Sequence, residues 1–243
     1  MCGRYASFRE AQSLADEFAV ASIADDVRLM PPSWNVAPTH AVRMVVARPE
    51  RLADGSPGQI ERTLRSARWG LVPSWAKDPA IGATMINARA ETVGTKPAFR
   101  RAFATRRALL PADGYYEWAP PDPTSGSRTK QPYFIHAADG AALALAGLYE
   151  FWRDAAKAQD DPTRWPVTAA IITTNAAGEL ARIHDRQPVI LAREQWDAWL
   201  DPGLDGADAA ALLGAPPPAL ELTAVSTAVN KVGSNGPDLI RAA

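Results

Sequence analysis

Short apolar segments, separated by turn-forming residues, constrain the fold of this chain more than any other feature of its sequence. Strands that recur about every 8–12 residues between turns are typical of antiparallel sheets that close into barrels or sandwiches. The sequence therefore predicts an α+β, β-rich fold, with an antiparallel, barrel-like sheet and peripheral helices. The β-prone segments are 41–48, 107–112, 115–118, 132–137, 143–152 and 166–174.

Helices and loops fill the rest of the chain. Apolar residues at helical spacing predict a helix at 9–20 and two more near the C-terminus. No internal repeat and no long linker interrupts the pattern, so a single domain over residues 1–243 is expected. The other segments are the helices 193–200 and 206–213, the turn-rich loop 52–60, the hairpin loop 119–130 and the polar insertion 153–165.

Composition excludes several classes of protein. The one cysteine rules out an internal disulfide and argues against a cysteine-based metal site. The three histidines lie far apart without ligand spacing, so neither a metal nor another cofactor is expected. No apolar run reaches the ~18 residues of a membrane span. The N-terminus has no apolar signal-peptide core, which indicates a cytoplasmic protein.

The net charge of −1 argues against a strongly basic nucleic-acid binder, but the basic residues are unusual. Of the 26, only five are lysines and 21 are arginines, whose planar fork suits phosphate and base contacts. GC-rich codon usage explains the same bias equally well. Segment 85–107 has the largest local excess: Arg89, Lys96, Arg100, Arg101, Arg106 and Arg107 against Glu91. For Arg106 and Arg107, a solvated helix face is the favoured interpretation.

Cys2 follows the initiator methionine directly, and its chemistry depends on that position. Removal of Met1 gives a residue with a thiol and a free α-amine, whose pKa of ~7.7–8.0 leaves a useful neutral fraction. The amine can form a Schiff base with an aldehyde, and the sulfur can then close a five-membered thiazolidine ring. A single residue thus supplies two nucleophiles. The alternative is a buried cysteine that acts as a small apolar residue.

Aromatic and polar residues elsewhere are candidates for a nucleic-acid surface. Trp69 and Trp75 flank a Gly- and Pro-containing segment and could stack on unpaired bases, although core packing is the commoner role of tryptophan. One of the two is expected at the surface. Asn87 and Arg89 alternate, so an extended segment would point them the same way.

Two residues are candidate proton carriers. Glu117 lies among aromatic and apolar neighbours, where burial would raise its pKa, although an exposed position at the rim of a sheet fits equally well. His184 stands between Arg182 and Asp185 and fits a tuned acid or base better than the other histidines do.

Nine motifs in this order, from residue 1 to about 240, resemble the SOS response-associated peptidase (SRAP) family. Together they are far more specific than any one of them. They are MCGRY (1–5), WNVAPT (34–39), RWGLVPSW (68–75), INARAET (86–92), PADGYYEW (111–118), AGLYE (146–150), TTNA (173–176), HDRQPVIL (184–191) and VSTAVN (225–230).

The resemblance implies a β-rich fold with a positively charged cleft for single-stranded DNA. It also implies removal of Met1, by self-cleavage or by an aminopeptidase, and crosslinking of Cys2 to the ring-opened sugar of an abasic site. Asn87 would orient the N-terminal residue, Glu117 would act as general acid and base, and His184 would assist ring opening and crosslink reversal. The resemblance further implies autopeptidase and lyase-type activity and a monomer. The residues expected to line the DNA path are Arg4, Asn35, Pro38, Trp69, Gly70, Pro73, Trp75 and Arg89.

One departure and two alternatives remain open. Gln187 stands where the family has a methionine, which could alter packing under His184. The alternatives are a peptidase or amidohydrolase that acts on other molecules through an N-terminal Cys2 nucleophile, and a module that binds single-stranded DNA without a covalent bond.

Overall fold

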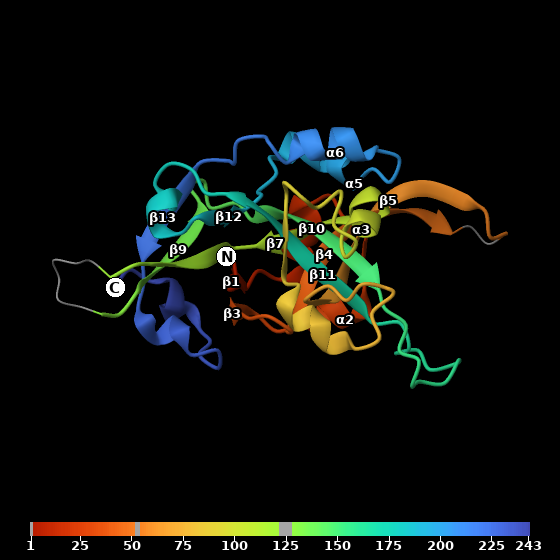
Figure 1. The fold of residues 1–243 in the computed structure, drawn as a ribbon, viewed down its shortest axis with the longest axis horizontal. Helices are drawn as coiled ribbons and strands as arrows, with labels where there is room; N and C mark the ends of the chain where they lie inside the picture. Colours follow the sequence, from red (N-terminus) through yellow and green to blue (C-terminus); the bar gives the residue numbers. More distant parts are fainter. Residues whose placement is uncertain (1, 52–53, 122–127) are drawn as a thin grey trace.

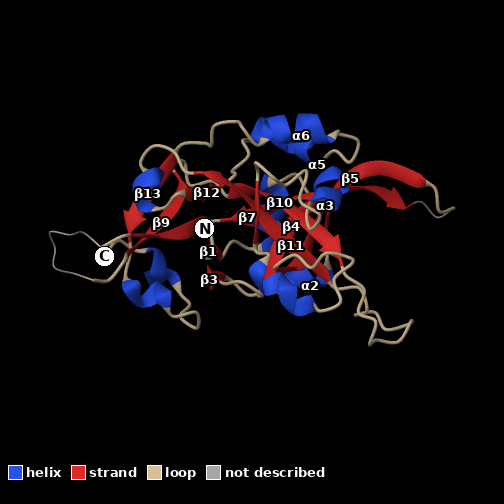
Figure 2. Ribbon diagram, in the orientation of Figure 1, coloured by secondary structure: helices blue, strands red, loops and turns tan. Residues whose placement is uncertain are grey.

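The computed structural model describes residues 2–51, 54–121 and 128–243, and these form two sheets with short helices around them (Figures 1 and 2). The first sheet has the strand order β13-β9-β8-β1-β3, and every neighbouring pair in it is antiparallel. Its strands are β1 (Tyr5–Ser7), β3 (Ser33–Val36), β8 (Gly114–Ala119), β9 (Gln131–Ala137) and β13 (Leu220–Ala224).

The second sheet has the order β12-β11-β10-β7-β4-β5-β2, and β6 pairs with β11 beside this path. A parallel pairing of β11 with β5 brings the two sides of the sheet together, at Thr168↔Arg68 and Ala169↔Trp69. The strands are β2 (Ser22–Ile23), β4 (Ala41–Arg51), β5 (Pro57–Trp69), β6 (Asn87–Arg89), β7 (Arg107–Ala112), β10 (Leu143–Phe151), β11 (Val167–Asn175) and β12 (Arg186–Pro188).

The β-rich α+β fold is confirmed, with one refinement of the sheet. The second sheet is ring-like but is not a true barrel, because its closure rests on one short parallel pairing. Three of its pairings are parallel, β11–β5, β11–β6 and β2–β5, so the sheet is not wholly antiparallel. Strand periodicity predicts the segments but does not report the direction of pairing between distant ones.

The helices are short and lie on the outside, as expected (Figure 2). The predicted helix 9–20 is confirmed with shorter bounds, and the chain turns at Ala19, where φ is +51°. Segment 193–200 divides into a 3-10 turn and a helix. The helical elements are α1 (Ala11–Glu17), α2 (Asp25–Arg28), α3 (Arg100–Thr105), α4 (Leu180–Ile183), α5 (Trp196–Leu200), α6 (Gly206–Leu212), η1 (Pro79–Thr84), η2 (Arg193–Gln195), η3 (Thr227–Asn230) and η4 (Pro237–Ile240).

The predicted loops join strands. Segment 119–130 connects the antiparallel strands β8 and β9, although residues 122–127 lie outside the described residues. Loop 52–60 is shorter than expected, because β5 begins at Pro57; residues 52–53 are likewise not described. Segment 153–165 joins β10 to β11 without a helix or strand of its own.

The core has three parts: one on each face of the second sheet, and a smaller one between the first sheet and the C-terminal segment. One face packs against α1, α5 and α6 through residues such as Phe18 and Trp196, whose rings stack at 4.4 Å. The other face packs against the first sheet through a cluster that includes Cys2, Tyr5, Trp69 and Tyr115. Because both faces are covered, β7 is buried along its whole length.

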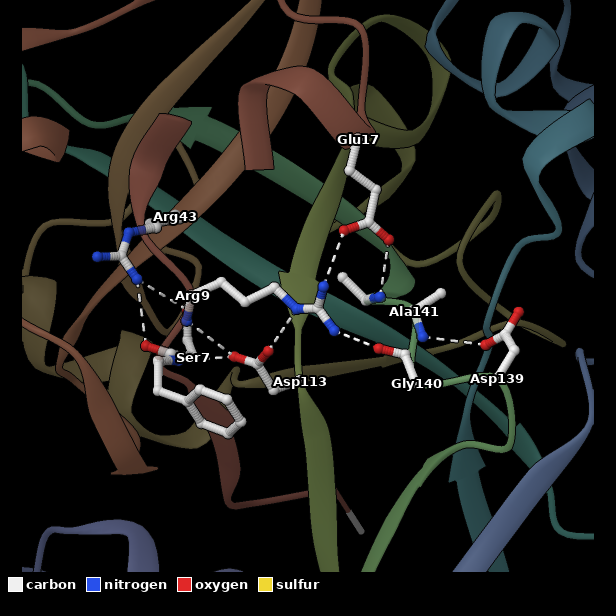
Figure 3. A network of polar contacts seen from close by, with 10 residues as sticks. Ser7, Arg9, Glu17, Arg43, Asp113, Asp139, Gly140 and Ala141 are labelled. Atoms are coloured by element: carbon white, nitrogen blue, oxygen red, sulfur yellow. Dashed lines mark hydrogen bonds and ion pairs between the residues drawn. The ribbon is translucent and has the colours of Figure 1, made fainter. Parts of the chain in front are cut away.

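A polar network fixes how β1 lies beside β8 (Figure 3). Asp113, just before β8, accepts hydrogen bonds from the backbone N–H of Phe8 (2.6 Å) and from Nε of Arg9 (2.7 Å), just after β1. Arg9 also binds Glu17 of α1 at 3.3 Å and the carbonyl of Gly140. This network holds the register in which Tyr5 lies opposite Tyr115.

Candidate functional site around Cys2

The pairing of β1 with β8 brings Cys2 to the carboxylate of Glu117. Tyr5 lies directly opposite Tyr115, and side chains alternate along a strand, so Tyr5, Tyr115 and Glu117 share one face. Cys2 precedes β1 and is fully buried in the apolar cluster that contains both tyrosines. Cys2 is also close enough to Glu117 for the carboxylate to affect its thiol electrostatically.

Asn87 reaches Cys2 from the other sheet. Its Nδ2 donates a hydrogen bond of 2.9 Å to the carbonyl oxygen of Cys2, across 85 residues of sequence. Asn87 begins β6, which pairs in parallel with β11 at Asn87↔Ile171. This contact suits a residue that orients the N-terminus, which remains a prediction.

Burial governs the ionisation of Glu117 and Cys2. Glu117 is buried, and desolvation raises its pKa, while the positive form of His184 acts in the opposite direction. Burial also raises the pKa of the Cys2 thiol far above its usual range, and the negative charge of Glu117 raises it further. The thiol is therefore protonated at neutral pH, and the carboxyl holds its proton to a higher pH than an exposed glutamate does.

His184 directly follows α4, which packs against β8. Its Nδ1 accepts a hydrogen bond from the backbone N–H of Arg186 at 2.9 Å and lies 2.8 Å from Oδ1 of Asp185. Nδ1 must be unprotonated to accept from Arg186 and protonated to donate to Asp185. The two contacts therefore belong to different positions of the ring proton, and the two tautomers of a neutral imidazole already differ in this way.

Arg186 joins β6, which carries Asn87, to β12, which begins two residues after His184, and the sequence did not single it out. Strands β6 and β12 both pair with Thr173 of β11, so they lie on opposite edges of that strand. Arg186 of β12 is buried and binds Glu91, just beyond β6, through two hydrogen bonds of 2.6 and 3.0 Å. This bidentate pair lowers the pKa of Glu91 through its hydrogen bonds and clamps the strands together. Its place two residues after His184 was the one feature of the sequence that could have indicated a role for Arg186.

Gln187, the departure from the family pattern, is accommodated inside the protein. It is buried in β12, and its Oε1 accepts a hydrogen bond from the backbone N–H of Ala177 at 3.2 Å. The amide thus has a partner, and the imidazole of His184 keeps its place at the end of α4.

Arg4 and Asn35, two residues expected to line a DNA path, contact each other and the C-terminal segment. Nη1 of Arg4 donates to Oδ1 of Asn35 (2.8 Å) and to the carbonyl of Val229 (2.9 Å), and the guanidinium lies over Trp118. Asn35 is buried, and its Nδ2 contacts the carbonyl oxygens of Val229, Lys231 and Ser234. These contacts tie β1 and β3 to the chain around η3.

The two tryptophans of the RWGLVPSW motif have opposite environments. Trp69 is fully buried, donates from Nε1 to the carbonyl of Ile86 (2.9 Å) and packs edge-on against Tyr5 at 5.2 Å. Trp75 is 60% exposed, which confirms that one of the pair is at the surface. Trp69 therefore packs beneath the surface against Tyr5. Only Trp75 of the two has a ring exposed enough to stack on a base.

The other expected DNA-path residues divide between the interior and the surface. Gly70 is buried at φ +125°, and a Cβ there would lie 2.4 Å from the carbonyl oxygen of Gly82, so this position requires glycine. Pro73 is buried, Pro38 is half-buried, and Arg89 is exposed at the end of β6.

The expectation that Arg106 and Arg107 lie on a solvated helix face is wrong. Arg106 forms an ion pair of 2.8 Å with Glu150, and Arg107 is buried in β7, where it donates to backbone carbonyl oxygens. The basic run ends inside the protein because β7 is covered on both faces. The exposed basic residues of the run are Arg89, Lys96, Arg100 and Arg101.

Three polar atoms around Cys2 have no hydrogen-bond partner among the described residues. They are the hydroxyl oxygens of Tyr5 and Tyr115 and Oδ1 of Asn87. Burial raises the pKa of both tyrosines, so the hydroxyls stay protonated. Such buried groups are uncommon, and a catalytic or binding role is one explanation for them.

Within the described ranges, no three His, Cys, Asp or Glu side chains gather as a metal site would require. No helix in the same ranges is long and apolar enough to cross a membrane.

Comparison with known proteins identifies the family. The family model for SOS response associated peptidase (SRAP) matches residues 1–232. The chain belongs to the SRAP family. Within it, the chain is 37% identical over 243 residues to the abasic site processing protein YoqW of Bacillus subtilis, with 99% of both chains covered. It is 31% identical over 253 residues to the abasic site processing protein YedK of Escherichia coli, again with 99% of both covered.

Solved structures share the SRAP fold. A protein from Bacteroides thetaiotaomicron superimposes with a TM-score of 0.80 at 24% identity over the whole of both chains, which shows the fold. A phage-related protein from Bordetella bronchiseptica has a TM-score of 0.62 at 32% identity, covering 92% of this chain and 94% of that one.

Proposed function

We propose that this SRAP protein, once Met1 is removed, captures abasic sites in single-stranded DNA by forming a thiazolidine at Cys2. The observation that supports this most is the convergence of Asn87 and Glu117 on a cysteine at the second position, with His184 near enough to act on the charge of Glu117. An abasic site suits such a residue, because its ring-opened sugar exposes an aldehyde and no base has to be flipped.

The proposed reaction needs no oxidant, reductant or cofactor. The α-amine of Cys2 adds to the aldehyde carbon, and the resulting carbinolamine loses water to give an imine. The sulfur then bonds to the imine carbon, and the thiol proton passes to nitrogen. The products are one thiazolidine and one water. While Met1 is attached, the nitrogen of Cys2 is an amide and cannot begin this sequence.

Glu117 and His184 supply the proton transfers in this proposal. Glu117 with a raised pKa can protonate the departing hydroxyl of the carbinolamine and take the proton back from nitrogen afterwards. His184, with its ring between Arg186 and Asp185, assists the opening of the sugar and the reversal of the crosslink. Asn87 holds the carbonyl of Cys2 so that amine and sulfur approach the same carbon.

The proposed DNA path runs over the surface beside Cys2. Arg4 and Arg89 would contact phosphates, and Trp75 would stack on a base. Asn35, Trp69, Gly70 and Pro73 would shape this path from within, and Pro38 would lie at its edge. This lining is an inference from the family motifs together with the exposure of each residue.

The ionisation of Cys2 argues against the peptidase alternative. A thiol nucleophile attacks a peptide carbonyl as the thiolate. The raised pKa of the buried Cys2 thiol disfavours that form, whereas attack on an aldehyde begins at the amine. A peptidase would turn over peptides and release them, and a non-covalent module would bind DNA equally well as Cys2→Ala.

Mass spectrometry of the purified protein tests the proposal, alone and after mixing with a single-stranded oligonucleotide that carries one abasic site. We expect loss of the Met1 mass and a heat-stable adduct one water lighter than the sum of the reactants. Met1 loss without any adduct would contradict the proposal.

A further inference from the structure

A second groove lies where β5 ends and β11 begins, and none of the roles above uses it. It encloses about 540 Å³ and is lined by the ends of these strands, the start of β4, a residue of α2 and the insertion between β10 and β11. In Figure 1 this insertion is the green-to-teal loop that extends beside α2.

The lining combines an exposed aromatic ring with basic side chains. Trp165 of the insertion is 53% exposed, and Arg65, Arg68 and Lys157 line the same groove. The one acidic side chain among the lining residues, Asp26, accepts a hydrogen bond from Ser66. Aromatic rings among positive charges are what single-stranded nucleic acid binds, through stacked bases and neutralised phosphates.

The groove adjoins the proposed DNA path. Thr39 lines it, follows Pro38, and donates from its backbone N–H to the carbonyl of Trp69 at 2.8 Å. Along β11, Val167 in the groove lies four residues before Ile171, the partner of Asn87. Four strand residues span about 13 Å. The groove and the partner of Asn87 are therefore close on the scale of an oligonucleotide, in which successive phosphates of one strand advance about 3.4 Å.

The residue just before the insertion contacts the loop that carries the other exposed tryptophan. Nε1 of Trp152 donates to the carbonyl of Ala76 at 2.7 Å, beside Trp75. Of the eight tryptophans, Trp75 and Trp165 are the two with more than half of their surface exposed, at 60% and 53%. The two open indole rings therefore belong to loops that are linked by this hydrogen bond, just before the insertion begins.

We propose that this groove binds the single-stranded DNA that flanks the abasic site, with a base stacked on Trp165 and phosphates bound by Arg65 and Arg68. This inference rests on the proposed function. It adds a binding site that the reacting residues do not provide, and it ties DNA affinity to the length of strand beside the lesion.

Binding of trimmed oligonucleotides tests the groove. The probes carry a tetrahydrofuran abasic analogue, which has no aldehyde. One probe has two nucleotides on both sides of the analogue, and two others have twelve nucleotides on one side and two on the other. For the wild-type protein we expect the long flank on one side to tighten binding about tenfold, the effect of one or two stacked bases and phosphates. Trp165→Ala should remove this gain, Trp165→Phe should restore most of it, and binding of the doubly trimmed probe should not change.

Salt dependence and a matched control separate the groove from general charge. Loss of Arg65 and Arg68 should lower the slope of log affinity against log salt by about 0.7 for each phosphate contact removed. Each single variant, Arg65→Ala or Arg68→Ala, is compared with Arg241→Ala, which also removes one positive charge, from an exposed residue of the C-terminal segment, and should leave the slope unchanged. Thermal midpoints confirm that each variant is folded.

Crosslinking to true abasic DNA distinguishes the two proposals. Wild-type protein that forms no adduct overturns the proposed function, whatever the groove binds. The proposal that the groove binds DNA is overturned if the wild-type protein forms an adduct and the Trp165→Ala variant still binds a long-flank probe as much more tightly as the wild type does.

Discussion

Two buried polar clusters in this protein differ in how completely their hydrogen bonds are satisfied. Arg107 in β7 has five N–H donors, and all of them meet carbonyl oxygens at 2.6–3.2 Å: Trp199, Phe103, Ala104, Asp201 and Leu204. Around Cys2, by contrast, Tyr5, Tyr115 and Asn87 each keep a polar atom with no partner among the described residues.

Under the proposed function, we interpret the Arg107 cluster as structural and the Cys2 cluster as suited to chemistry. Arg107 ties α3 and α5 to the sheet, and its interactions are complete within the protein. The groups around Cys2 retain hydrogen-bonding capacity that a bound substrate can use, at a cost in stability. Loss of Arg107 should therefore affect folding, whereas changes around Cys2 should affect chemistry.

Substitution of Cys2 gives the largest expected effect. Cys2→Ser keeps the α-amine but replaces the sulfur, so borohydride should still trap an imine while the stable adduct disappears. The thermal midpoint should change little, because the side chains have almost the same size. Gel analysis with and without borohydride measures both results, and a heat-stable adduct from Cys2→Ser would break the assignment of Cys2 as the crosslinking residue.

Substitution of Arg107 should give the largest loss of stability. Arg107→Met removes the donor from five carbonyl oxygens, two of them in fully buried hydrogen bonds, which we expect to lower the free energy of unfolding by about 3 kcal/mol. The folded fraction should crosslink at the wild-type rate. Urea unfolding measures the loss of stability, and active-site titration measures the crosslinking rate of the folded fraction. A urea midpoint equal to that of the wild type would contradict the structural role assigned to Arg107.

Glu117 gives a pH-dependent effect of intermediate size. Its pKa is raised by burial, so the folded protein holds the proton more tightly than the unfolded chain does. Wild-type stability should fall as pH rises from the usual carboxyl range through the raised pKa. Glu117→Gln does not titrate, so its stability relative to wild type should be higher at pH 8 than at pH 4, while its crosslinking rate falls. Denaturation at several pH values checks the sign, and the opposite trend would show that Glu117 is stabilised as a carboxylate.

Removal of single tyrosine hydroxyls should give the smallest changes in stability. Tyr149→Phe serves as the matched control for Tyr5→Phe. The hydroxyl of Tyr149 accepts a hydrogen bond of 3.0 Å from Nε of Arg48, whereas that of Tyr5 has no partner among the described residues. Tyr149→Phe should therefore cost about 1 kcal/mol, and Tyr5→Phe should be neutral or stabilising. Calorimetry of the two variants compares them directly, and an equal loss in both would mean that Tyr5 is satisfied within the fold.

Local patterns in the sequence determined the strands β4 and β7 to β11, the helices α1, α5 and α6, and the chemistry available to Cys2. Runs of β-prone apolar residues fix segments such as β7 and β10, because backbone preference and side-chain alternation act over a few residues. The position of the single cysteine likewise determines that one residue can supply both an amine and a thiol.

Only the tertiary structure decided which of these residues meet. The ring closes because Trp69 pairs with Ala169, a hundred residues away, and Glu117 is buried because β1 and β8 share a sheet. For the same reason Trp69 is buried while Trp75 is exposed, and Arg107 is inside a sheet although it ends a basic run. Burial and strand pairing depend on contacts between distant segments, and no short stretch of sequence contains that information.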